Sequence, residues 1–276
     1  RNNGKGFEKE KLPIGPFVGS VVRAFDFDHD GDKDLFVGAR VKRAMFPNAP
    51  PSYIIRNEAG NFIEPQSFDL GMVTDAVWSD YDGDGWEDLL IAREWSSLTI
   101  LKSGGGKTFT ESRVEKLMEK NGFWSGITAA DLDKDGDHDY IVGNLGKNHR
   151  FTVSETFPMR LYAIDIDKNG FIDPLVTSYW KDAKGVMQEY PVNYLDELVA
   201  QSPLFRKKFT SYTKFSYAVT DSIINRSEIP AGNQYTVNNT SSYILWNDKG
   251  HFRWEELPPV VQTAPLKKIL VTDFNS

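Results

Sequence analysis

The sequence predicts an all-β fold, namely a β-propeller of four-stranded blades with a helical insertion in one blade. Aromatic residues make up 13% of the 276 residues, which favours strands. Short apolar segments of strand-like composition recur along the chain, separated by turns rich in Asp, Asn and Gly. Acidic loops that begin at residues 26, 80 and 131 repeat with a period near 50 residues. A period of this length with four strands per repeat is typical of a propeller blade.

Composition and charge exclude several classes of protein. The chain has no cysteine, which excludes disulfides, cysteine zinc sites, iron–sulfur clusters and a cysteine nucleophile. The formal net charge of −7 argues against a nucleic-acid partner, which requires a basic surface. Because no apolar run approaches about 18 residues, no membrane span is expected.

The acidic residues are concentrated in four repeated segments of nine residues. These segments contain 18 of the 39 acidic residues, a crowding that is self-repelling unless cations lie among the carboxylates. The four segments are 26–34, 80–88, 131–139 and 165–173. A fifth segment begins at Asp273 and reaches the end of the sequence at Ser276.

The spacing inside each segment is that of a calcium loop. Carboxylates or amides at positions 1, 3, 5 and 9 can converge on one ion, and Gly at position 6 permits the sharp turn around it. A backbone carbonyl at position 7 completes the set. All-oxygen ligation with several carboxylates suits Ca²⁺ better than softer metals or Mg²⁺. The alternative is four acidic turns without metal, because Asp and Gly are common turn residues.

These loops are not EF-hands, which require a Glu at position 12. Position 12 is instead apolar in all four segments, occupied by Val37, Ile91, Val142 and Val176. Apolar segments also precede each loop, so each unit is predicted to be strand, calcium loop, strand. The fourth loop carries Asn169 at position 5, and the smaller charge is expected to weaken its calcium binding.

A second repeated element completes the blade. Residues 52–62 match residues 242–252, and both are predicted to be a hairpin with an Asn/Gly turn. Two hairpins per repeat give four strands. The short spacing between the loops at 131 and 165 suggests an abbreviated third blade. The long spacing from 165 to 273 suggests an insertion in the fourth.

The insertion is expected at residues 181–241, within the fourth blade. Residues 194–199 and 215–224 have helix-like spacing of apolar residues, with basic residues between or beside them. Two interpretations are open. The insertion is either a cap over a propeller face or a lid that binds a partner or substrate.

The loops followed by Leu35-Phe-Val-Gly38 resemble FG-GAP/VCBS repeats, the calcium-bearing propeller repeats of integrin α-subunits and many bacterial secreted proteins. The insertion is similar to that of a bacterial surface branch often accompanied by an ASPIC/UnbV module. The resemblance covers nearly the whole chain. It implies a propeller of seven blades, of which residues 1–276 are a single fragment of about four blades cut at both ends.

The resemblance also implies the ligands of about four Ca²⁺ ions. Side-chain ligands would be Asp26, Asp28, Asp30 and Asp34; Asp80, Asp82, Asp84 and Asp88; Asp131, Asp133, Asp135 and Asp139; and Asp165, Asp167, Asn169 and Asp173. Backbone carbonyl ligands would be Asp32, Trp86, Asp137 and Phe171.

Three functions fit these features. The first is a calcium-stabilised binding or scaffold module, not an enzyme, outside the cell or on a bacterial outer surface. It would bind a protein or carbohydrate ligand on a propeller face, with Trp95 or Trp180 as candidate contacts. The second is a propeller-type lyase or glycosidase, although no residue such as Glu94 is singled out as catalytic. The third is a structural subunit of an outer-surface assembly.

Overall fold

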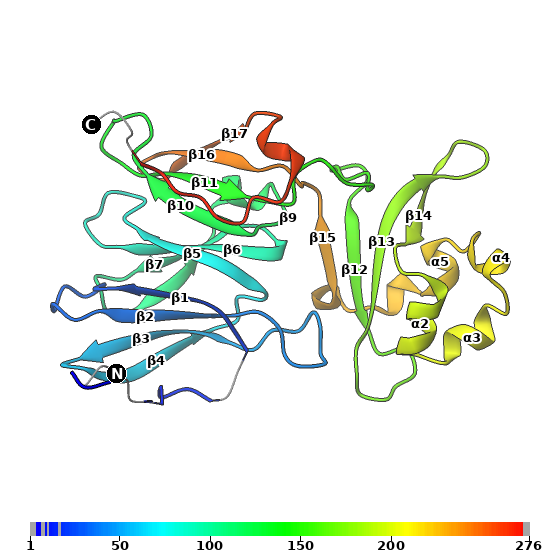
Figure 1. The fold of residues 1–276 in the computed structure, drawn as a ribbon, viewed down its shortest axis with the longest axis horizontal. Helices are drawn as coiled ribbons and strands as arrows, with labels where there is room; N and C mark the ends of the chain where they lie inside the picture. Colours follow the sequence, from blue (N-terminus) through cyan, green and yellow to red (C-terminus); the bar gives the residue numbers. More distant parts are fainter. Residues whose placement is uncertain (1–3, 7–8, 10, 16–17, 273–276) are drawn as a thin grey trace.

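The computed structural model describes residues 4–6, 9, 11–15 and 18–272. Strands dominate, and they form four antiparallel sheets of four strands each, with one further short strand on the second sheet. The predicted all-β, propeller-like fold is confirmed (Figure 1).

Three of the sheets are blades, numbered here in chain order. Blade 1 contains β1 (Gly19–Phe25), β2 (Asp34–Ala39), β3 (Ser52–Glu58) and β4 (Asn61–Phe68). Blade 2 contains β5 (Val73–Ser79), β6 (Asp88–Ser96), β7 (Thr99–Ser103) and β8 (Phe109–Ser112), followed by α1 (Glu115–Met118) and by β9 (Gly122–Phe123), which pairs with β6. Blade 3 contains β10 (Gly126–Ala130), β11 (Asp139–Gly143), β16 (Tyr243–Asp248) and β17 (His251–Glu256).

The blades stack against one another in chain order (Figure 1). Their first strands are neighbours: Arg23 Nε in β1 donates to the Ala76 carbonyl in β5 over 2.7 Å. Successive residues of a strand point to opposite faces. Leu89 of β6 therefore lies in the core between blades 1 and 2, and Leu90 lies in the core between blades 2 and 3. Both are fully buried, so each blade stabilises the next.

Blade 3 is completed by strands from far downstream, which differs from the sequence expectation. A fourth blade was expected from residue 165, with an insertion at 181–241. Instead β11 pairs with β16, and the chain leaves and returns between these two strands. The ends of this excursion meet, because Gly146 N donates to the Thr240 carbonyl over 2.8 Å. Strand patterns identify strands but not their partners, so the 34-residue spacing between the third and fourth loops does not mark an abbreviated blade.

The excursion, residues 144–242, is called the inserted unit below. Its sheet has the order β14, β13, β12, β15 and stands beside the blades (Figure 1). The strands are β12 (Met159–Ile164), β13 (Asp173–Lys181), β14 (Met187–Pro191) and β15 (Gln234–Val237). The helices are α2 (Leu195–Gln201), α3 (Leu204–Lys208), α4 (Tyr212–Phe215) and α5 (Thr220–Ile223). Short 3-10 turns are Arg226–Glu228 and Ala231–Asn233, with a third at Val261–Thr263 after β17.

Helices α2 and α5 form where helical spacing was predicted, whereas α3 and most of α4 lie between the two predicted segments. The helices cover one face of this sheet (Figure 1). Leu198 and Phe205 pack in one core with Tyr162 and Leu175 of the strands. The buried Glu189 carboxylate in β14 also binds Arg160 over 2.7 Å and Arg226 over 2.9 Å. The inserted unit therefore has its own core and its own charged network.

After β17, the chain returns along the free side of β10. Ser125 Oγ donates to the Leu266 carbonyl over 2.8 Å, and Thr128 Oγ1 donates to the Ile269 carbonyl over 3.3 Å. The segment that contains Leu266 and Ile269 therefore lies beside β10 in the same way that β10 lies beside β5. The predicted fifth acidic segment, from Asp273, lies outside the described residues. No helix within the described residues is long and apolar enough to cross a bilayer.

Candidate metal centres

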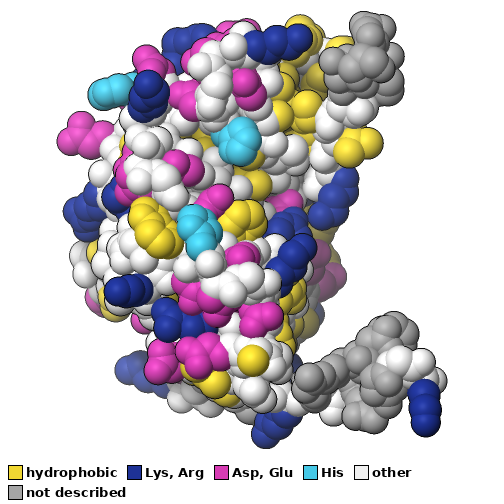
Figure 2. Space-filling view, turned by 90° about the vertical axis from the view of Figure 1, so that its left-hand side faces the viewer, with side chains coloured by type: hydrophobic (Ala, Val, Ile, Leu, Met, Phe, Trp, Pro, Cys, Tyr) yellow, Lys and Arg dark blue, Asp and Glu magenta, His cyan; other side chains and the backbone are white. Residues whose placement is uncertain are grey.

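Three of the four acidic loops lie at the same end of the blades. The loops of residues 26–34, 80–88 and 131–139 connect the first and second strands of blades 1, 2 and 3. Figure 2 looks onto this end, where Asp and Glu side chains gather together with histidines. The fourth loop, residues 165–173, connects β12 and β13 in the inserted unit.

Each loop turns around the carboxylate at position 1. The backbone N–H of the position-6 glycine donates to this carboxylate in all four loops, over 2.8 to 3.2 Å. The four pairs are Gly31 with Asp26, Gly85 with Asp80, Gly136 with Asp131 and Gly170 with Asp165. These glycines have φ between 88° and 100°, which side chains rarely adopt, so the requirement for glycine is conformational.

The carboxylate at position 9 is buried and joins each blade loop to the third strand of its blade. Asp34 accepts from Asn57 N over 2.8 Å, Asp88 from Ser103 N over 2.7 Å, and Asp139 from Asn247 N over 2.9 Å. In the inserted unit, Asp173 accepts from Ile166 N over 2.9 Å, a contact within its own loop. The loop and the outer hairpin of a blade are therefore one hydrogen-bonded unit.

Burial of these position-9 carboxylates makes their negative charge unfavourable. Loss of hydration raises the pKa of Asp34 to about 6 and that of Asp88 to about 7. The same cause raises the pKa of Asp139 and of Asp173. A cation nearby would oppose these shifts.

The carboxylates of each loop converge. In the first, second and fourth loops, carboxylate oxygens from positions 1, 3 and 9 lie within 4.8 Å of one another. In the third loop, the oxygens that lie this close come from positions 1, 3 and 5. The groups are Asp26, Asp28 and Asp34; Asp80, Asp82 and Asp88; Asp131, Asp133 and Asp135; and Asp165, Asp167 and Asp173. Asp30, Asp84 and Asp139 lie outside these groups, although each belongs to its predicted set.

Several of these oxygens are buried without a hydrogen-bond partner, which is costly for a carboxylate. They are Asp82 Oδ1, Asp88 Oδ2, Asp137 Oδ1 and Asp167 Oδ1. Asp82 and Asp167 occupy position 3, and Asp88 occupies position 9. Crowded carboxylates with unpartnered buried oxygens and no nitrogen or sulfur donor fit a hard divalent cation such as Ca²⁺.

Positions 5 and 7 shape the loops from within. The position-5 side chains Asp30, Asp84, Asp135 and Asn169 each accept the backbone N–H of position 7, over 2.8 to 3.1 Å. At position 7, Asp32 accepts from Ala59 N over 2.6 Å and Asp137 from Lys249 N over 3.0 Å, which holds the turns of the outer hairpins. Trp86 and Phe171 fill position 7 in the other two loops, and Phe171 is exposed.

Two loops contain an internal cation that sequence reasoning did not identify. Arg56 Nε lies 3.1 Å from Asp28 Oδ2 in blade 1. Lys102 Nζ in blade 2 binds Asp82 and lies 3.0 Å from Asp84 Oδ2. In both blades, the residue after position 9 pairs with a residue of the third strand. The cation is the next residue along that third strand. In blade 3 this place belongs to Trp246, so the third loop has no equivalent cation.

Two histidines of the acidic loops contact the neighbouring blade. His29 stacks on Trp86 with ring centroids 4.8 Å apart, and its Nε2 lies 3.2 Å from Glu87 Oε2. His138 Nδ1 lies 3.1 Å from Ser79 Oγ in blade 2. Each contact crosses a blade boundary, which sequence spacing alone cannot reveal.

The candidate ligand-contact tryptophans lie mainly in the interior. Trp95 is buried and packs against Phe123, so it is not an exposed contact. Trp180 is half-buried beside Phe151. Glu94, which the sequence left without a role, forms an ion pair with Arg40 over 2.6 Å.

Asn57 and Asn247 were missed as parts of the site, yet a signal for them exists. Both occupy the same place in the repeated outer hairpins, and their backbone N–H groups bind the position-9 carboxylates. The Asn57 and Asn247 side chains also donate to the carbonyls of Lys33 and His138, which precede position 9. Their recurrence at matching positions in residues 52–62 and 242–252 could have identified them.

The blades and their acidic loops define a propeller-like protein with repeated loops whose carboxylates could hold metal ions. Residues 80–142 match the family described as FG-GAP-like repeat, a range that runs from the loop of blade 2 to β11 of blade 3. Residues 80–142 therefore contain an FG-GAP-like repeat, as the sequence predicted. No curated protein matches the chain. The likeness to the ASPIC/UnbV branch stays a prediction.

Proposed function

We propose that this chain is a calcium-stabilised binding or scaffold module that acts outside the cell and catalyses no reaction. FG-GAP repeats are typical of extracellular binding modules. The observation that carries the calcium proposal is the set of converging carboxylates with buried, unpartnered oxygens in the loops. A bound Ca²⁺ supplies the positive charge that these oxygens lack.

The loops explain how calcium would stabilise the fold. The position-9 carboxylates connect each loop to the third strand of its blade, so a cation at the loop would hold two hairpins together. Four divalent ions would change the formal charge from −7 to about +1. Calcium loops of extracellular modules commonly have affinities of about 0.1–1 mM, so they fill outside the cell and empty in the cytosol.

A count of bound calcium tests this proposal. The chain is equilibrated with about 10 mM CaCl₂, well above extracellular affinities, and its metal content is measured at equilibrium by dialysis and mass spectrometry. We expect three to four ions per chain. A variant with Asp26→Asn, Asp80→Asn and Asp131→Asn should retain only the ion of the inserted unit. An unchanged count in this variant, or no ion in the parent chain, contradicts the proposal.

A further inference from the structure

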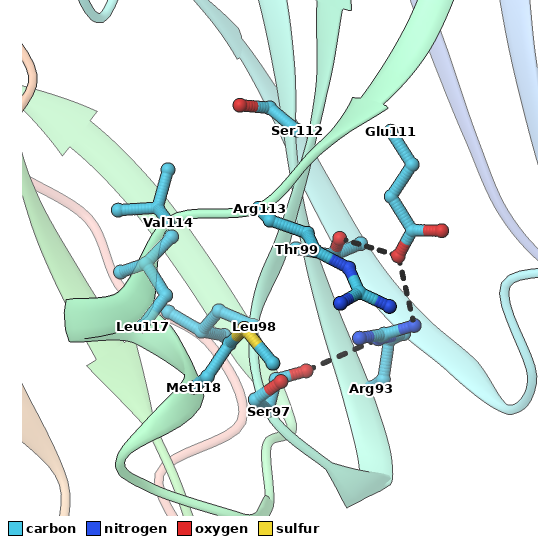
Figure 3. A pocket seen from close by; sticks show the side chains of 10 residues that line it. All are labelled: Arg93, Ser97, Leu98, Thr99, Glu111, Ser112, Arg113, Val114, Leu117 and Met118. Carbon is cyan, nitrogen blue, oxygen red and sulfur yellow. Dashed lines mark hydrogen bonds and ion pairs between the residues drawn. The ribbon is translucent and has the colours of Figure 1, made fainter.

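A cavity of about 190 Å³ lies at the end of β6 opposite to the calcium loop of blade 2 (Figure 3). Its walls come from the end of β6, the β6–β7 turn, the end of β8 and helix α1. Ten residues line it, and only three of them are charged: Arg93, Glu111 and Arg113. No function described above uses this cavity.

Arg93 is held rigidly in the cavity wall. Its side chain is 12% exposed. Nε donates to the Ser97 carbonyl over 3.1 Å, and Nη1 donates to the Leu70 carbonyl over 3.3 Å. Loss of hydration lowers the pKa of Arg93. Two neutral carbonyls therefore hold the guanidinium in place. They compensate little of its positive charge.

Among the described residues that line the cavity, one carboxylate faces this charge, and it is already engaged. Glu111 Oε1 lies 3.8 Å from Arg93 Nη1, beyond hydrogen-bond distance, and accepts from Thr99 Oγ1 over 2.8 Å. Arg113 brings a second guanidinium, and Figure 3 shows its side chain extending toward Arg93 and Glu111. Arg113 has no hydrogen bond or ion pair with any described residue. The cavity thus has an excess positive charge and free donors.

The rest of the cavity combines the hydroxyl residues Ser97, Thr99 and Ser112 with an apolar wall. Leu98 and Leu117 are 2% exposed and form its inner wall. Met118, which is 51% exposed, lies at the rim and has a flexible side chain that can adapt to a ligand. An apolar cavity of about 150 Å³ holds a molecule the size of benzene, so this one has room for about eight non-hydrogen atoms.

We propose that this cavity binds a small organic monocarboxylate. Its carboxylate would lie between the Arg93 and Arg113 guanidiniums, which form charge-assisted hydrogen bonds with planar carboxylates. Its aliphatic part would pack against Leu98, Leu117 and Met118. The site is independent of the calcium loops, because it lies at the other end of β6 from Asp88.

Isothermal titration of the calcium-loaded chain with 4-methylpentanoate tests this site. We expect a Kd of about 1 mM or below, which is typical of a ligand with few contacts. The neutral amide of the same acid should not bind. Inorganic phosphate, which has no apolar part, should bind more weakly. Absence of binding by the acid at about 10 mM, or equal affinity for the amide or for phosphate, would overturn the proposal.

Variants assign the binding to the cavity. Arg113→Gln should weaken the affinity for 4-methylpentanoate by about tenfold or more, because one charge-assisted hydrogen bond is lost. Arg113 is exposed, so the variant should fold normally. Arg43→Gln is the matched control, since Arg43 is also exposed and lies outside the cavity. Equal affinity in the Arg113 and Arg43 variants would overturn the assignment.

Discussion

The Asp139 carboxylate accepts a hydrogen bond of 2.9 Å from the backbone N–H of Asn247, which lies 108 residues further along the chain. It also accepts one of 3.2 Å from Leu132 N, and it is only 1% exposed. One side chain thus connects the acidic loop of blade 3 with the strand that returns after the inserted unit. Blade 3 is a single sheet in spite of the long interruption because this contact and the β11–β16 pairing close it.

Asp139→Ala should destabilise the chain even without calcium. The change leaves one buried and one partly buried N–H group without an acceptor, which costs about 2–4 kcal/mol of the free energy of unfolding. Denaturant unfolding in calcium-free buffer measures it. Asp135→Ala is the control, since Asp135 is exposed and should cost less under these conditions. Equal losses in the two variants would contradict the structural role of Asp139.

Lys102→Met should strengthen calcium binding by the loop of blade 2. Lys102 binds Asp82 and Asp84, so a calcium ion must displace it or share these carboxylates. Burial disfavours charged Lys102, but its hydrogen bonds to Asp82 and Asp84 prevail and raise its pKa, so it stays protonated. We expect an affinity gain of about tenfold for one ion, measured by calcium titration calorimetry.

Lys107→Met is the matched control for this experiment. Lys107 is exposed in the turn between β7 and β8 of the same blade and is not within ion-pair distance of these loop carboxylates. Its replacement should leave all calcium affinities within about twofold. A similar gain in both variants would show that general charge, rather than the contact at Asp82, sets the affinity.

The effect of Asp88→Asn on the free energy of unfolding should depend on pH. The pKa of Asp88 rises from 3.8 to about 7 on folding, so the wild-type carboxyl favours the folded state below pH 4 and loses this contribution as the pH rises through 7. Asparagine does not titrate. In calcium-free buffer, the variant should therefore gain stability relative to wild type between about pH 4 and 7.

Thermal unfolding of both chains across this pH range makes the comparison. With saturating calcium the order should reverse near pH 7, because the variant lacks one ligand charge. A constant difference between the two chains at every pH, with or without calcium, would contradict the assigned burial and role of Asp88.

Replacement of residues 147–239 by a short Gly–Ser linker should leave the three blades folded. The ends of the inserted unit already meet, with Gly146 N and Thr240 O 2.8 Å apart. The deletion exposes Met72 and Trp95, which pack against the unit, so some loss of stability is expected. Far-ultraviolet circular dichroism and the calcium count measure the outcome. The count should fall by one, and an unfolded product would contradict the independence of the blades.

The repeated sequence pattern predicted the loops and the outer hairpins because these features depend on residues close together in the chain. Loop spacing, position-6 glycines and strand composition act within about ten residues, and the predicted loops and outer hairpins formed at 52–62 and 242–252. The partner of β11 could not be predicted in the same way, since strand pairing depends on contacts between distant segments. The insertion therefore begins earlier in the chain than expected, and the fourth acidic loop lies within it.

Within the site, the sequence predicted which carboxylates converge better than what surrounds them. Three carboxylates converge in each loop, although the predicted ligands Asp30, Asp84 and Asp139 lie outside these groups. The cations Arg56 and Lys102 come from another strand, so no spacing within the loops points to them. The same holds for the burial of Asp34 and Asp88, which depends on the packing of whole blades.

Differential scanning calorimetry of the chain over a range of free calcium tests the central claim most directly. Each site filled at tenfold above its Kd adds about 1.4 kcal/mol to the free energy of unfolding. Three to four sites should together raise Tm by about 7–10 °C relative to calcium-free buffer. Magnesium at the same concentration should raise it much less. An unchanged Tm at about 10 mM calcium, well above extracellular affinities, would contradict calcium stabilisation of these loops.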